Sequence, residues 1–151
     1  MLAHHLHTEI EIDAPTDVVW DVLVDLDHYP DWNPFIVEAV GTVAVGQRLT
    51  NRLQPPGGRA MTFKPVVTEV ESGRSFEWLG RLGLPALVDG RHRFELRPTS
   101  SGATRRVHTE RFGGLLGPLL RRSLDRNTVP GFEAMNEAMK QRAEARATSR
   151  P

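Results

Sequence analysis

Two histidines and a glutamate on neighbouring predicted strands are the side chains of this sequence best suited to chemistry. His92 lies in a run over residues 88–97, and His108 and Glu110 lie in a run over residues 103–112. Imidazole titrates near neutral pH and a nearby carboxylate orients it, so these groups could act as a general acid and base. They could instead form a buried hydrogen-bonded cluster that orients the polar end of a ligand. We favour the second interpretation, because the sequence has neither a nucleophile elbow nor a glycine-rich phosphate loop.

The strand that carries His92 alternates cleanly between two kinds of residue. One face consists of Val88, Gly90, His92, Phe94 and Leu96. Every residue of the other face is charged. A strand divided in this way has one face in the core and one in water. His92 and Phe94 are therefore predicted to point into the protein.

The following strand allows two registers. A turn over residues 98–102 would pair Arg97 with Ala103 and bring the two histidines close together. The inward side chains would then be Arg106, His108, Glu110 and Phe112. The competing register would bury Val107 and Thr109 and leave the histidine and the glutamate of this strand in water. We favour the first register because it also buries a phenylalanine.

A second wall of the predicted pocket comes from the C-terminal third of the chain. Phe132, Met135 and Met139 recur at helical spacing with small residues between them. Small residues and flexible thioethers fill a concave sheet poorly, and methionine adapts to varied apolar guests. Trp78 adds aromatic lining. Leu116 belongs to an apolar segment before the helix, residues 115–120, which we call the apolar lip. An apolar pocket with a few convergent polar groups is the usual form of a small-molecule site.

Hydrophobic periodicity outlines the elements that must position these residues. Residues 8–12 alternate as a strand, and a helix is predicted to begin at Pro15 and end near Asp27. Six further strands are predicted over residues 36–45, 48–54, 59–70, 75–81, 88–97 and 103–112. Their short connections, including the separator at residues 83–85, are typical of antiparallel hairpins. The last third is helical, and Pro130 predicts either two helices or one helix kinked near residues 127–129.

For three smaller features we prefer a structural interpretation to a functional one. Residues 32–35, Trp-Asn-Pro-Phe, are predicted to form a corner in which Asn33 caps the local backbone, with a gate to the cavity as the alternative. The N-terminal histidines lack a carboxylate partner, so no metal site is predicted. Arg121, Arg122 and Arg126 are interpreted as a solvated helix face.

Composition excludes several classes of protein. A length of 151 residues suits one domain over residues 1–151, and the absence of cysteine excludes a disulfide scaffold, thiol catalysis and a cysteine-based zinc site. The 19 basic residues balance 19 acidic ones, which argues against a nucleic-acid partner. No run reaches the ~18 apolar residues of a membrane-spanning helix, and the N-terminus does not resemble a signal peptide. We expect a cytoplasmic protein with no cofactor and no stable membrane insertion; its oligomeric state, a homodimer included, stays open.

Several motifs resemble those of one superfamily. They are Ile10-x-Ile12-x-Ala14-Pro15-x-x-x-Val19-Trp20-x-x-Leu23 and Tyr29-x-x-Trp32-Asn33-Pro34-Phe35, followed by Gly90-x-His92-x-Phe94, Thr104, Glu110-x-Phe112 and Phe132-x-x-Met135-Asn136-x-x-Met139-Lys140. Over about residues 7–145 the chain resembles the START-like (SRPBCC) superfamily, which includes the birch pollen allergen and the bacterial polyketide cyclase/dehydrase and lipid-transport proteins.

The resemblance implies an α+β helix-grip fold. A seven-stranded curved antiparallel sheet would wrap around one long C-terminal helix, with two short helices after the first strand and a hydrophobic cavity inside. Members bind lipids, sterols, quinones or polyketides, and a few are enzymes, so the fold alone does not choose among these activities.

We therefore expect the chain to bind, and in that way to transport or sense, a small hydrophobic molecule such as a lipid, polyketide or quinone. The expected contacts are Trp78, His92, Phe94, His108, Glu110, Phe112, Leu116, Phe132, Met135 and Met139. One alternative is a polyketide cyclase or dehydratase whose catalytic residues are His92, His108 and Glu110. The other is an accessory protein that acts through protein or membrane contacts of the apolar lip.

Overall fold

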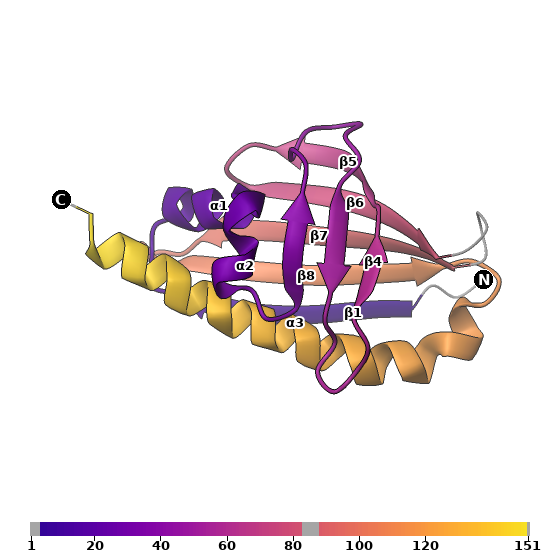
Figure 1. Ribbon diagram of the computed structural model, residues 1–151. Helices are drawn as coiled ribbons and strands as arrows, with labels where there is room; N and C mark the ends of the chain where they lie inside the picture. Colours follow the sequence, from indigo (N-terminus) through magenta and orange to yellow (C-terminus); the bar gives the residue numbers. More distant parts are fainter. Residues whose placement is uncertain (1–3, 83–87, 151) are drawn as a thin grey trace.

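A computed structural model describes residues 4–82 and 88–150 of the chain, so the predicted separator at residues 83–85 lies outside the described residues. The elements in chain order are β1 (His4–Ile12), α1 (Thr16–Val24), the 3-10 helix η1 (Leu26–His28), α2 (Tyr29–Trp32), β2 (Ile36–Val40), β3 (Thr50–Leu53), β4 (Met61–Phe63), β5 (Val66–Glu71), β6 (Ser75–Leu82), β7 (Val88–Pro98), β8 (Thr104–Gly113) and α3 (Gly117–Thr148). Figure 1 shows α3 running along a broad sheet, with the strands of a second, smaller sheet in front of it and crossing its strands.

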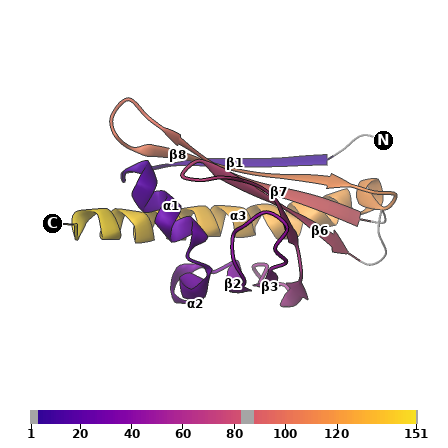
Figure 2. The same cartoon turned by 90° about the horizontal axis from the view of Figure 1, so that it is seen from above.

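The strands are antiparallel and form two sheets. The larger has the order β1-β8-β7-β6-β5, and the smaller has the order β2-β3-β4. Seen from above, α3 lies between β1 and β8 on one side and α2, β2 and β3 on the other (Figure 2). The expected α+β architecture, with a long C-terminal helix against a curved antiparallel sheet, is confirmed.

The expectation of one seven-stranded sheet is wrong, because the described residues form eight strands in sheets of five and three. The predicted strand over residues 59–70 is divided into β4 and β5 at Pro65. Proline has no N–H to donate to a strand ladder, so a run of strand pattern breaks there. The carbonyl of Pro65 still accepts a hydrogen bond of 2.8 Å from the N–H of Leu49, which joins the two sheets locally.

The helices also differ from the expected ones at their ends. The first helix ends at Val24 rather than near Asp27, since Asp25 leaves the helical region with a ψ of 72°. The last helix is a single element from Gly117 to Thr148 that continues through Pro130, so of the two alternatives left open by the sequence, two separate helices is wrong and one helix is confirmed. Pro130 is exposed, and the backbone carbonyl that loses its N–H donor there can be hydrated.

The corner after α2 is confirmed as a backbone cap. The Oδ1 atom of Asn33 accepts hydrogen bonds from the N–H of Phe35 at 3.0 Å and of Ile36 at 2.9 Å. Trp32 packs edge-on against Tyr29 with 5.1 Å between ring centroids. The chain is thereby turned from α2 into β2, which starts the smaller sheet.

Candidate functional site

The register between β7 and β8 differs from the predicted one by two residues. Pro98 pairs with Thr104, whereas the prediction paired Arg97 with Ala103. The prediction was wrong because β7 continues through Pro98, so the turn begins one residue later. It is closed by a hydrogen bond of 2.9 Å from the N–H of Thr99 to the carbonyl of Ala103.

A shift of two residues keeps every side chain on its predicted face, because side chains alternate along a strand with period two. The favoured inward orientation is therefore confirmed. Arg106, His108 and Phe112 are buried, and the side chain of Glu110 is 14% exposed. His92 lies directly across the sheet from Glu110.

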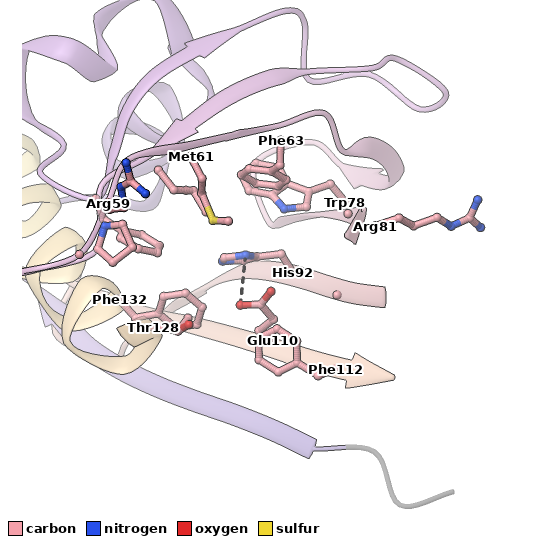
Figure 3. Close-up of a pocket in the computed structure, with 16 residues that line it drawn as sticks. Arg59, Met61, Phe63, Trp78, Arg81, His92, Glu110, Phe112, Thr128 and Phe132 are labelled. Atoms are coloured by element: carbon pink, nitrogen blue, oxygen red, sulfur yellow. Dashed lines mark ion pairs between the residues drawn. The ribbon is translucent and has the colours of Figure 1, made fainter. Parts of the chain in front are cut away.

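A pocket of about 320 Å³ opens beside these residues. Its lining comes from the two sheets, α3, the corner after α2 and the connection between β3 and β4: Phe35, Leu53, Pro55, Gly58, Arg59, Met61, Phe63, Trp78, Gly80, Arg81, Gly90, His92, Glu110, Phe112, Thr128 and Phe132. Figure 3 shows Phe63 and Trp78 on one side of the pocket and Phe112 and Phe132 on the other, with the His92 ring and the Glu110 carboxyl between them. The site is an apolar, aromatic pocket whose two inner polar groups are the His92 imidazole and the Glu110 carboxyl, with Arg59, Arg81 and Thr128 also in its lining.

Two glycines that pair across β6 and β7 make room for this pocket. A Cβ atom on Gly80 would lie 3.2 Å from the ring of Phe63, and one on Gly90 would lie 2.8 Å from Oε1 of Glu110. A side chain at Gly90 would therefore displace the carboxyl group. The pocket owes part of its volume, and the position of its acid, to the absence of side chains at this pair.

The two polar groups inside the pocket are uncharged at neutral pH. Burial raises the pKa of Glu110 to about 8. Burial, with a smaller contribution from the positive charge of Arg106, lowers the pKa of His92 to about 3. The His92 Nδ1 atom and the Glu110 Oε2 atom are 3.7 Å apart, which is beyond hydrogen-bond distance. At neutral pH the pocket therefore presents a neutral imidazole and a protonated carboxyl.

His108 lies behind His92 and is hydrogen-bonded to it. The Nε2 atoms of the two rings face each other, so one N–H is shared between them. Burial is the main reason why the pKa of His108 lies well below its ordinary value. The neighbouring His92 and Arg106 lower it further. The ring of Phe132 stacks on His108 with 3.9 Å between centroids, which separates this histidine from water.

Arg106 is a fully buried cation without a carboxylate partner among the described residues. Its Nη1 atom donates to the side-chain oxygen of Asn136, whose Nδ2 atom donates to Thr8 at 2.9 Å. Its Nε and Nη2 atoms have no hydrogen-bond partner in the described part of the chain. Burial lowers the pKa of Arg106 to about 10, which still leaves the guanidinium charged at neutral pH.

The structure brings half of the predicted contact residues to the pocket. Those that line it are Trp78, His92, Glu110, Phe112 and Phe132. Phe94, His108, Met135 and Met139 are buried in the core outside the lining. Leu116 is 39% exposed at the start of α3 and is also outside the lining. Ligand contact by any of these residues stays a prediction.

The pocket has a side that sequence analysis missed. Leu53, Arg59, Met61 and Phe63 come from β3, β4 and the connection between them. The Pro-Pro-Gly-Gly segment within that connection signals a turn, but no sequence pattern shows that the turn reaches the long sheet. Phe35 also lines the pocket, so the corner after α2 both caps the backbone and borders the cavity.

The described residues hold no group of three or more histidine, aspartate or glutamate side chains placed to bind a metal ion. No helix in residues 4–82 and 88–150 is long and apolar enough to cross a membrane.

Comparisons with known proteins agree on one family and one fold. The family model described as "Polyketide cyclase / dehydrase and lipid transport" matches residues 3–144. Similar solved structures include the Zhui aromatase/cyclase from Streptomyces sp. R1128, with 19% identity, 96% of each chain covered and a TM-score of 0.79. A norcoclaurine synthase point mutant from Thalictrum flavum, in complex with a transition-state analogue, has 19% identity, 96% coverage of each chain and a TM-score of 0.74. A START superfamily protein from Mycobacterium smegmatis has 17% identity, covers 94% of this chain and 98% of its own, and has a TM-score of 0.72. No curated protein matches the chain by sequence.

Proposed function

The chain belongs to the polyketide cyclase/dehydrase and lipid transport family, and from that premise we propose that it binds a small hydrophobic molecule in the pocket beside α3. The purpose of binding would be transport or sensing of a lipid, polyketide or quinone. The observation that carries the proposal is a cavity of about 320 Å³ with five aromatic side chains, Phe35, Phe63, Trp78, Phe112 and Phe132, around the neutral imidazole of His92 and the neutral carboxyl of Glu110.

The energetics of this pocket suit an apolar guest. Removal of apolar surface from water contributes about 25 cal/mol per Å² before the costs of association. Phe63, Trp78, Phe112 and Phe132 offer flat faces on two sides, which favours a planar or polycyclic body. The polar groups of His92 and Glu110 would orient such a guest rather than supply most of its affinity.

The pocket is better suited to binding than to base catalysis. A general base works best with a pKa near the working pH. His92, with a pKa of about 3, and His108, whose pKa is also lowered well below its ordinary value, are weak bases at neutral pH. This argues against the alternative in which a histidine removes a proton next to a carbonyl.

A cyclase or dehydratase remains a second candidate, favoured by one observation. The Glu110 carboxyl faces the pocket and has a pKa raised to about 8. It therefore keeps its proton at neutral pH and could act as a general acid. In that case Glu110→Gln would abolish turnover while ligand affinity changed little. Equal turnover of the variant and the wild type would exclude this role.

The proposal is tested by native mass spectrometry of protein purified from its own host, combined with a variant that fills the pocket. Wild-type protein should carry a lipid-, quinone- or polyketide-like mass adduct. Gly80→Val, which puts a side chain next to Phe63, should lose it. Arg91→Val, on the exposed face of β7, is the matched control and should retain the adduct. Absence of any adduct from wild-type protein, together with no uptake of added apolar ligands, would contradict the proposal.

A further inference from the structure

The inner end of the pocket specifies a particular ligand chemistry. We propose that His92 Nδ1 and Glu110 Oε2 form a two-donor clamp for one oxygen atom of the ligand, and that the pocket prefers a planar ligand whose buried oxygen is a phenolate or enolate. This inference rests on the proposed function, since it names the class of molecule that the same pocket would take.

The distance between the two atoms fits a shared acceptor. At 3.7 Å, His92 Nδ1 and Glu110 Oε2 are too far apart to bond to each other. An oxygen at an ordinary hydrogen-bond length of about 2.8 Å from each would complete a triangle with them. Figure 3 shows both groups directed into the space between the aromatic walls. One ligand oxygen can therefore contact both groups at once.

Glu110 acts as a donor in this arrangement. No arginine or lysine among the described residues lies within ion-pair distance of its carboxyl, and burial raises its pKa to about 8. A carboxyl group that keeps its proton at neutral pH can donate its O–H to an oxyanion, as a protonated acid does in the oxyanion holes of some enzymes.

The hydrogen bond between the two histidines makes His92 the second donor. Only one of the two facing Nε2 atoms can carry the proton. If it were His92, the proton of the neutral His108 ring would sit on Nδ1, which makes no hydrogen bond in the described part of the chain. The side chain of Asn136 lies near His108, but its oxygen already accepts a hydrogen bond from Arg106. A buried N–H group without an acceptor is rarer in proteins than a buried acceptor without a donor. The positive charge of Arg106 further disfavours a proton on Nδ1 of His108. His108 therefore donates to His92, whose own proton lies on Nδ1 and faces the pocket.

The charges around the clamp favour an anion. Arg106 adds an uncompensated buried positive charge behind the histidines, held by an amide rather than by a carboxylate. At the mouth, Arg59 is exposed, and Arg81 lies 3.7 Å from the carboxylate of Asp89. In a pocket of low dielectric, two fixed donors and an excess of positive charge stabilise a developing or full oxyanion more than water would. His108 and Arg106 touch no ligand in this picture, so they are positioning residues.

The test compares three probes of nearly equal shape at neutral pH. They are 2-methylnaphthalene, 2-naphthol, and a 2-naphthol acidified by electron-withdrawing substituents so that it is ionised. We expect affinity, measured by calorimetry or by quenching of tryptophan fluorescence, to rise in that order, with the naphtholate about tenfold tighter than the hydrocarbon. Equal affinities, or weakest binding of the naphtholate, would overturn the clamp and leave the proposed function standing. Failure of all three to bind would overturn both.

Variants locate the preference within the pocket. Glu110→Leu and His92→Phe should still bind 2-methylnaphthalene but lose the roughly tenfold preference for the naphtholate. Arg93→Gln, on the exposed face of β7, should keep it. If Arg59→Gln abolished the preference instead, the anion would be recognised at the mouth, and the clamp would be overturned.

The tautomer of His92 gives a readout that does not depend on any variant folding. Nitrogen-15 NMR of histidine-labelled wild-type protein should show His92 protonated at Nδ1. A proton on Nε2 of His92 would overturn the proposal, because Nδ1 would then accept rather than donate. As a second measurement, His108→Gln, which can donate through its amide, should retain the naphtholate preference, whereas His108→Leu should lose it.

Discussion

The two faces of β7 and β8 carry the same kinds of charged residue and use them in opposite ways. On the outer face of β7 each arginine meets a carboxylate: Arg91 with Glu77 at 2.9 Å, Arg93 with Glu69 at 2.9 Å, and Arg97 with Glu95 at 2.8 Å. On the inner face, Arg106 is held by an amide and Glu110 has no arginine partner among the described residues.

The same contrast appears in the acids themselves. A hydrogen bond from Arg97 lowers the pKa of Glu95, whereas burial raises that of Glu110 to about 8. Exposed ion pairs contribute little to stability because water and salt already screen them. A buried polar group without a full set of partners is costly, and the ligand proposed above would complete the hydrogen bonds of the inner face.

The largest expected difference between the faces comes from two adjacent residues. Phe94 is fully buried among the rings of Trp78, His92 and His108, and Arg93 lies on the solvent side. Phe94→Ala should lower the free energy of unfolding by about 3–5 kcal/mol through cavity formation. Arg93→Ala should lower it by less than about 1 kcal/mol. Urea unfolding of both variants checks this, and comparable losses would contradict the division into two faces.

A double-mutant cycle compares one polar pair from each face. The inner pair, Arg106 and Asn136, is buried and hydrogen-bonded, so its coupling energy should be about 2 kcal/mol. The outer pair, Arg93 and Glu69, should couple by about 0.5 kcal/mol or less. The cycles use Arg106→Met with Asn136→Leu and Arg93→Met with Glu69→Leu. Stronger coupling in the outer pair would show that solvent exposure does not control these energies.

The pH dependence of stability gives the smallest but most specific difference. With its pKa raised to about 8, Glu110 keeps its proton in the folded state while the unfolded chain has lost it, so stability should fall as pH rises. Above the unfolded histidine pKa of about 6.5, His92 no longer contributes to the slope. Between that pH and about 8, unfolding should become easier by at most about 1.4 kcal/mol per pH unit.

The matched variants for this slope are Glu110→Gln and Glu95→Gln. The first should remove most of the loss of stability between neutral pH and pH 8, leaving the smaller loss from exposed His28, whose pKa is raised by its hydrogen bond with Asp25. The second should leave the slope unchanged, because the pKa of Glu95 is lowered and its ionisation is complete below that range. Denaturant titrations at a series of pH values measure the slope. A wild-type slope in Glu110→Gln would mean that another group titrates there.

The contrast between the faces and the presence of a cavity were predictable, but the side of the pocket formed by β3, β4 and their connection was not. Strict alternation over residues 88–97 assigns each side chain to water or core, and a register error of two residues leaves that assignment intact. The pairing itself depended on whether Pro98 ended the strand, which a sequence pattern decides poorly because proline is tolerated at strand ends.

The pocket depends on contacts between segments distant in sequence. Trp78, His92, Glu110, Phe112 and Phe132 were predictable as inward residues from period and spacing. The return of the β3–β4 connection toward α3, with Arg59 and Met61, follows from where Pro65 divides one predicted strand into two sheets. No local pattern encodes that placement, so the β3–β4 side of the pocket had to come from the structure.

The glycine pair at the base of the pocket has a consequence for the entropy of binding. The backbone at Gly80 and Gly90 is already held in place by the pairing of β6 with β7. A ligand in contact with this backbone would therefore immobilise no side chain there. Ordering a long, mobile side chain on association costs about 0.5–1.5 kcal/mol. That cost falls instead on Arg59 and Met61 at the exposed rim. The base of the pocket is therefore preorganised, and the conformational adjustment to different guests is confined to its edge.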